Sequence, residues 1–138
     1  MTGCRSHDDA ASLACLAGLP GISPGPLASL LSHHSVHEAV AVARGDQPAR
    51  GPIAKYLAKR QKMRTNWPAA VRERPPAWYL EALERSSTTV LRPGDLGYPP
   101  QLVDDPRRPP VLFVRGDLTC LASRRVGVVG TRNCTCLL

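Results

Sequence analysis

Aromatic residues are scarce in this chain of 138 residues, which contains 2 tryptophans, 3 tyrosines and 1 phenylalanine. A hydrophobic core must therefore be built mainly from aliphatic side chains. The sequence also lacks the roughly 18 consecutive apolar residues that a membrane-spanning helix needs. Its N-terminus lacks the basic start and the uninterrupted apolar stretch of a secretory signal. These absences predict a cytoplasmic protein without a membrane partner.

Patterns typical of a metal site are missing as well. The 5 cysteines include no CxxC pair with a second ligand pair downstream, as a structural zinc site would need. Cys134 and Cys136 would share one face of an extended segment, but no further ligand accompanies them. His33 and His37 have i, i+4 spacing on a predicted helix, so they are either a metal pair or solvated residues of a helix face. We expect no metal and no cofactor.

Proline, glycine and positive charge are abundant instead. The chain has 14 prolines and 11 glycines, which predict short elements separated by turns, and its formal net charge is +7. A basic protein favours an anionic partner such as nucleic acid over a neutral metabolite. A general excess of arginine is the alternative explanation, so the positions of the cations must decide.

The first 75 residues have the pattern of a small helical domain of the SAM or helix-hairpin-helix kind. Apolar residues recur at helical spacing within residues 10–43. The segment 19–26 lies between two of these helical runs, and its glycines form a turn that could present backbone N–H groups to a phosphate. Pro24 and Pro26 each remove such a donor, so a simple helical corner is the alternative.

A basic stretch follows this helical pattern. Residues 53–63 are predicted to form one helix that carries Lys55, Lys59 and Lys62 along one face. Such a cluster can contact nucleic-acid phosphates without regard to base sequence, and these contacts weaken as the salt concentration rises. The alternative is a solvated helix face with extended lysine stems.

Proline-containing segments at 66–68 and 74–76 are predicted to break the helical pattern and to mark a domain boundary at residue 75. Beyond the boundary, residues 78–84 form an amphipathic helical pattern. Three short apolar strands are predicted at 88–91, 110–114 and 125–129. We therefore expect an α/β chain with two domains, a helical one at 1–75 and the start of a sheet at 76–138.

The third predicted strand ends in the turn Gly130-Thr131-Arg132, whose residue types suit a phosphate. Glycine lets a phosphate approach the backbone, the threonine hydroxyl can donate to it, and the arginine offers a planar pair of donors. A generic strand end of a Rossmann-like protein is the alternative. Arg115, at the end of the second strand, is a further candidate for a phosphate contact.

Three motifs, in this order along the chain, resemble the DprA/Smf family of bacterial DNA-processing proteins. The motifs are Gly94-Asp95 with Tyr98-Pro99, then PPVLFVRGD at residues 109–117, then VVGTR at residues 128–132 with Thr135. The resemblance implies a Rossmann-like parallel sheet after the helical domain, and this chain would contain only the incomplete start of that sheet.

Resemblance to this family implies a protein without catalytic activity that binds single-stranded DNA in transformation and recombination. Such a protein protects the DNA and assists loading of the RecA recombinase. The resemblance places Gly130, Thr131 and Arg132 in a basic pocket for DNA phosphates. It also implies a possible homodimer, whose surface we expect to be missing from this chain. No nucleophile, base and orienting group come together in the sequence, which agrees with a protein that is not an enzyme.

The family pattern stops after Thr135, where a longer chain would continue with further strands and a second glycine loop. We therefore expect the N-terminal portion of a longer protein, with reduced or no activity. Two other functions stay open at this point. One is a nucleotide-binding Rossmann-like enzyme fragment, and the other is a helical module whose basic face contacts DNA or a protein.

Overall fold

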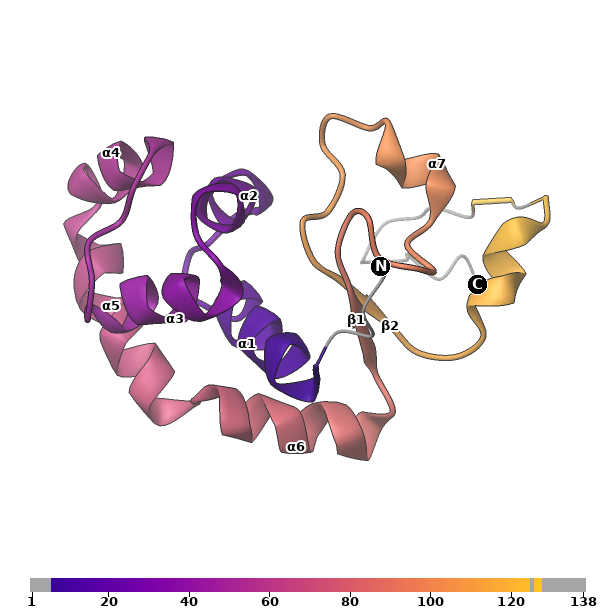
Figure 1. Ribbon diagram of the computed structural model, residues 1–138, viewed down its shortest axis with the longest axis horizontal. Coiled ribbons are helices and arrows are strands. Elements are labelled where there is room, and N and C mark those ends of the chain that lie inside the picture. Colours follow the sequence, from indigo (N-terminus) through magenta and orange to yellow (C-terminus); the bar gives the residue numbers. More distant parts are fainter. Residues whose placement is uncertain (1–5, 125, 128–138) are drawn as a thin grey trace, which may run out of the picture.

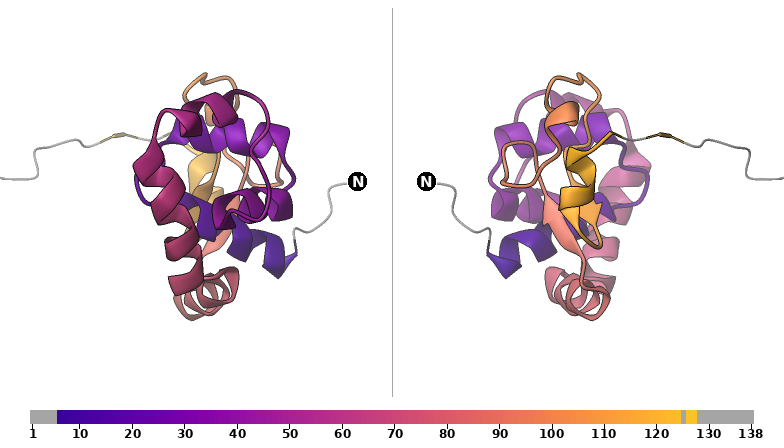
Figure 2. Two further views of the ribbon diagram at one scale, coloured as in Figure 1. Left: turned by 90° about the vertical axis from the view of Figure 1, so that its left-hand side faces the viewer. Right: turned by 90° about the vertical axis from the view of Figure 1, so that its right-hand side faces the viewer.

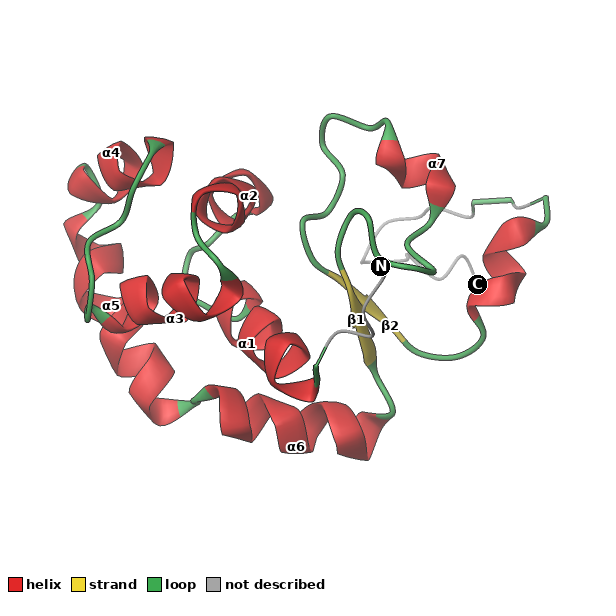
Figure 3. Cartoon of the chain, viewed as in Figure 1, coloured by secondary structure: helices red, strands yellow, loops and turns green. Residues whose placement is uncertain are grey.

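The computed structural model describes residues 6–124 and 126–127, and most of these residues are helical (Figures 1 and 3). The helical character predicted for residues 10–43 and 78–84 is confirmed. None of the helices in the described ranges is both long enough and apolar enough to cross a membrane. The first six helices are α1 (His7–Ala17), α2 (Pro24–His33), α3 (Val36–Arg44), α4 (Pro52–Ala58), α5 (Gln61–Glu73) and α6 (Pro76–Ser86).

Local sequence explains where α3 begins and ends. The Ser35 hydroxyl accepts from the Glu38 N–H at 3.2 Å, and the Glu38 carboxylate accepts from the Ser35 N–H at 2.8 Å. This reciprocal capping box satisfies two N–H groups that a helix start leaves without partners. Gly45 ends the helix at φ +88°, a left-handed conformation that glycine adopts without a steric penalty.

Helix α1 lies at the centre of the molecule and contacts α3, α6 and β1. Leu13 and Leu16 on α1 are completely buried. Helix α6 packs along α1, with Tyr79 against the end of α1 at Gly18. A β-carbon at Gly18 would collide with the Tyr79 hydroxyl, so any larger residue there would displace the Tyr79 side chain.

The prediction of one helix over residues 53–63 is wrong. Helix α4 ends at Ala58, and Arg60, with φ −128° and ψ 71°, separates it from α5. The Arg60 guanidinium lies over the Tyr56 ring, 4.0 Å from the ring centre. This cation–π contact links the bend to α4.

The predicted helix break at residues 66–68 is also wrong, because α5 continues through Pro68. The neighbouring Trp67 side chain is only 2% exposed, and its Nε1–H donates to the Pro20 carbonyl at 3.0 Å. Tertiary packing therefore outweighs the loss of one helical hydrogen bond at the proline. The predicted break at 74–76 is confirmed, since α5 ends at Glu73 and α6 begins at Pro76.

Two short strands, β1 (Thr89–Leu91) and β2 (Leu112–Val114), form a two-stranded antiparallel sheet with Thr89 opposite Val114. The strands predicted at 88–91 and 110–114 are confirmed, but the prediction that they belong to a parallel sheet is wrong for this pair. Their connection contains only the 4-residue helix α7 (Pro100–Val103), which is too short to act as the crossover helix of a βαβ unit.

The third predicted strand, at 125–129, falls largely outside the described residues. Val126 and Gly127 are described, and neither belongs to a strand. Before them, β2 leads into the 3-10 helix η1 (Leu118–Ala122). Asp117 caps this segment, because its carboxylate accepts from the Thr119 N–H at 2.8 Å.

One hydrophobic cluster joins the helices to the β1–β2 pair. It contains Leu13 of α1, Trp67 of α5, Val90 of β1 and Val111 beside β2. As the composition predicts, most of its members are aliphatic. The division of the chain into domains at residue 75 stays a prediction.

Candidate nucleic-acid interface

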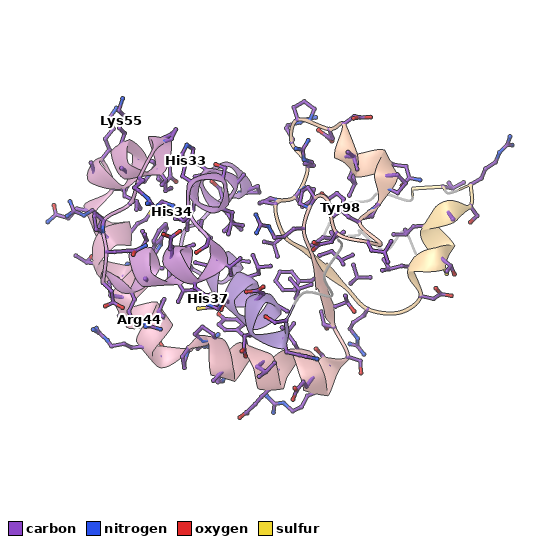
Figure 4. All side chains as sticks on the ribbon, viewed as in Figure 1. His33, His34, His37, Arg44, Lys55 and Tyr98 are labelled. Atoms are coloured by element: carbon purple, nitrogen blue, oxygen red, sulfur yellow. The ribbon has the colours of Figure 1, made fainter. Side chains whose placement is uncertain are left out.

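Exposed cations gather on α4, on α5 and on the turn between them. Figure 4 shows Lys55 pointing outward from α4, away from the body of the molecule. The left view of Figure 2 looks onto α4 and α5 directly. We define the α4–α5 basic surface by five exposed side chains, namely Lys55, Lys59, Arg60, Lys62 and Arg64.

The positive charge of the α4–α5 basic surface is not neutralised locally. The sequence contains no acidic residue from 52 to 72. In the described part of the chain, the side-chain ion pairs join other residues: Arg44 to Asp46 at 3.5 Å, Arg50 to Glu38 at 2.9 Å and His37 to Asp9 at 3.3 Å. An uncompensated cluster of this kind attracts a polyanion more strongly than a neutral ligand.

The three lysines that the sequence singled out lie within this surface but not along one helix face. Lys55 belongs to α4, Lys59 follows the end of α4, and Lys62 belongs to α5. The bend at Arg60 therefore spreads them over two helices. Their role in contacting DNA stays a prediction.

The phosphate-binding turn predicted at Gly130, Thr131 and Arg132 lies outside the described residues. Arg115 is described and exposed, in the loop between β2 and η1. This loop lies at the opposite end of the molecule from α4 and α5 (Figure 1). The fold therefore does not bring Arg115 to the α4–α5 basic surface.

The predicted helix face shared by His33 and His37 is wrong. His33 is the last residue of α2, and Ser35 caps the new helix α3, which contains His37. His37 faces Asp9, and the exposed His33 places its Nδ1 at 3.0 Å from the Ser29 carbonyl oxygen. Within residues 6–124 and 126–127, no three histidine, cysteine or acidic side chains are arranged to hold a metal ion.

His34 is a structural residue that sequence reasoning missed. It is 6% exposed, with Nδ1 at 3.0 Å from the Leu30 carbonyl oxygen and Nε2 at 3.1 Å from the Arg50 backbone nitrogen. The Arg50 N–H can only donate, so Nε2 is the acceptor and Nδ1 carries the proton. Through these two hydrogen bonds, His34 links the end of α2 to the loop that precedes α4. His34 lies between α2 and α3, whereas the hydrophobic pattern predicts helix for residues 10–43 without locating the break between these two helices. The sequence therefore contains no signal that separates His34 from His33 and His37.

The segment 19–26 forms a corner that is anchored to α5 through the bond from Trp67 to Pro20. Helix α2 begins at Pro24, so Gly25 is the single N–H donor among its first three residues. This geometry favours the helical corner over a phosphate-binding hairpin.

Cys15 is a buried cysteine of α1. It is 2% exposed, and its thiol donates to the Arg74 carbonyl at 3.6 Å. Burial raises the pKa of Cys15 to about 11, against an opposing effect of Arg44. The thiol is therefore protonated near neutral pH, which suits a core residue and not a nucleophile or a metal ligand.

Fold and surface together define a mostly helical protein with a small antiparallel sheet and an uncompensated basic surface at one end. Residues 89–137 match the family model described as DNA recombination-mediator protein A. The match confirms the resemblance to the DprA/Smf family over these residues. The match begins at the first residue of β1 and includes Gly130, Thr131 and Arg132, whereas α1 to α6 precede it. No curated protein and no solved structure matches the chain.

Proposed function

We propose that this protein binds single-stranded DNA in transformation and recombination, protects it, and assists loading of the RecA recombinase. The observation that carries this proposal is the family match over residues 89–137, whose description names a mediator of DNA recombination. In this proposal, Gly130, Thr131 and Arg132 bind a DNA phosphate, and Arg115 is a second candidate contact. No catalytic step is proposed.

The α4–α5 basic surface supports a second DNA contact in the helical part. Its five cations have no acidic neighbour in the sequence from 52 to 72, and lysine and arginine bind phosphates without regard to base sequence. This observation also favours the second candidate function, in which the helical part alone is a DNA-binding module.

Arg132→Ala tests the proposed phosphate turn in the full chain. Fluorescence anisotropy with a labelled single-stranded oligonucleotide gives the dissociation constant at several salt concentrations. We expect weaker binding to all base sequences and a logarithmic salt slope that is smaller by about 0.7, the value for one single-strand phosphate contact. Wild-type protein that fails to bind the oligonucleotide at low salt would contradict the proposed function itself.

A triple variant tests the helical contact. Removal of the three lysines of the α4–α5 basic surface should reduce the affinity for the oligonucleotide and the salt slope. The reduction per cation removed should be larger than that caused by removing exposed arginines elsewhere in the chain. If only the lysine variant weakens binding and Arg132→Ala does not, the helical module is the better description. The triple variant is Lys55→Ala with Lys59→Ala and Lys62→Ala, and the control is Arg85→Ala with Arg107→Ala.

A further inference from the structure

A cleft of about 560 Å³ opens beside the α4–α5 basic surface. The loop 45–49 forms one side, Ala54, Leu57 and Ala58 of α4 form another, and α5 contributes Trp67. This volume lies within the range of sites that enclose small organic ligands, about 300–1,000 Å³. The cleft is therefore large enough for one nucleotide unit.

The lining of the cleft is mixed, with polar and apolar groups in nearly equal proportion. The alanines contribute apolar lining together with Leu57 and Trp67, which are only 8% and 2% exposed. Gln47 contributes an amide, and Asp46 and Arg64 contribute opposite charges. An isolated phosphate does not suit apolar walls beside a carboxylate, because it would lose hydration and face a like charge. A planar, uncharged heterocycle with N–H donors suits both the walls and the carboxylate.

Arg64 connects the cleft to the surface around it. It lines the cleft, and it is one of the five cations of the α4–α5 basic surface. Asp46 is paired with Arg44 at 3.5 Å through Oδ2, so its charge is partly balanced. A nucleotide that enters here would thus meet a cation for its phosphate and a carboxylate oxygen for its base.

We propose that the cleft receives one base of a single-stranded DNA whose phosphates contact the α4–α5 basic surface. The inference rests on the proposed function and adds to it a base-binding site in the helical part. Asp46 accepts a hydrogen bond from an exocyclic amino group, and Arg64 donates to the adjoining phosphate. Cytosine is consequently preferred to thymine, which has a carbonyl oxygen in place of the amino group.

Trp67 provides a direct readout. The chain has 2 tryptophans, so Trp78→Phe leaves Trp67 as the single indole. This variant is titrated with a twelve-nucleotide oligo-dC and with an abasic oligomer of the same length. We expect the Trp67 fluorescence to change with oligo-dC and to stay constant with the abasic oligomer, while anisotropy reports binding of both.

Two other outcomes would overturn the inference in distinguishable ways. If oligo-dC binds by anisotropy without a change at Trp67, or if the abasic oligomer produces the same change, the cleft holds no base and the proposed function survives. If neither oligomer binds, the proposed function fails and the base site fails with it.

Filling the cleft is the second test. Ala58 is an exposed residue of the cleft wall, and Ala69 is an exposed residue of α5 that does not line the cleft. Ala58→Phe should weaken oligo-dC binding about tenfold, because the base is excluded from the cleft, without weakening binding of the abasic oligomer. Ala69→Phe is the matched control, and an equal effect of both variants would contradict the site.

Base preference tests the role of Asp46. Wild-type protein should bind oligo-dC more tightly than oligo-dT, and Asp46→Asn should abolish this difference because an amide can satisfy either base. Equal affinities of the wild type for the two oligomers would remove Asp46 from the site.

Discussion

At Trp67, burial and a hydrogen bond act on the same side chain. The ring is 2% exposed, and its Nε1–H donates to the Pro20 carbonyl at 3.0 Å. Trp67→Phe retains much of the apolar contact but leaves this carbonyl without its donor. We expect it to lower the free energy of unfolding by about 1–3 kcal/mol, measured by urea denaturation with circular dichroism.

Trp78 supplies the control for this measurement. It is 41% exposed on α6, and its ring contacts the Arg74 guanidinium at 5.1 Å. Trp78→Phe should change the free energy of unfolding by less than Trp67→Phe does. An effect of Trp67→Phe no greater than that of the control would contradict the role given to the Pro20 bond.

Cys15 allows a prediction about reactivity. Its pKa of about 11 and its burial both suppress the thiolate, which is the reactive form. In native protein at pH 8, iodoacetamide should modify the exposed Cys120 on η1 and leave Cys15 unmodified. Peptide mapping by mass spectrometry measures both sites, and unfolding in urea should expose Cys15. Equal labelling of the two cysteines in native protein would contradict the buried position.

At the scale of a single element, the cap of α3 predicts a pH dependence. The pKa of Glu38 is lowered from 4.5, first by the hydrogen bond from the Ser35 N–H and then by the Ser35 hydroxyl and Arg50. Since the folded value lies below the unfolded one, this stabilisation is complete above pH 4.5 and is lost as the pH falls through the folded pKa.

Glu38→Gln isolates this effect, because glutamine can retain the capping geometry without the charge. Melting temperatures between pH 7 and pH 3 should fall further in the wild type than in Glu38→Gln. Glu81→Gln, at an exposed position of α6, is the control and should behave as the wild type does. Identical pH profiles of wild type and Glu38→Gln would show that the cap contributes nothing through its charge.

Periodicity was sufficient to predict α1, α2 and α6, because their apolar residues face one core at regular spacing. It failed around α4 and α5, where long-range contacts decide. The bend at Arg60 accompanies the contact of its guanidinium with the Tyr56 ring. Helix α5 continues through Pro68, where the buried Trp67 donates a hydrogen bond to the Pro20 carbonyl. Neither of these two contacts can be predicted from the spacing of apolar residues along the sequence.

One part of the candidate site, the basic surface, could be predicted from the sequence, but the cleft beside it could not. The excess of lysine and arginine from 55 to 64 is visible in the sequence, and the exposed surface follows from it. The cleft is not visible, because it needs the loop after α3 to lie against α4 and α5. The antiparallel direction of β2 was likewise hidden, since two apolar strands look the same in either orientation.

At the scale of the whole molecule, the shared core predicts coupled stability. Leu13 of α1 and Val90 of β1 belong to one cluster. Leu13→Ala should lower the free energy of unfolding by about 2–5 kcal/mol, and amides in both α1 and β1 should lose protection in hydrogen exchange. Leu96→Ala, at a residue that is 88% exposed, is the control. Loss of protection confined to α1 would contradict a common core.

The central position of α1 also bears on the order in which the protein assembles. During synthesis α1 is made before α3, α6 and β1, which are the elements that it contacts. Helix α3 follows soon after α1, but α6 and β1 begin only at Pro76 and Thr89. Contacts of such wide sequence separation slow folding. Helix α1 is therefore fully enclosed only after β1 has been made, and until then Leu13 and Leu16 are apolar surface that a chaperone could bind on the nascent chain.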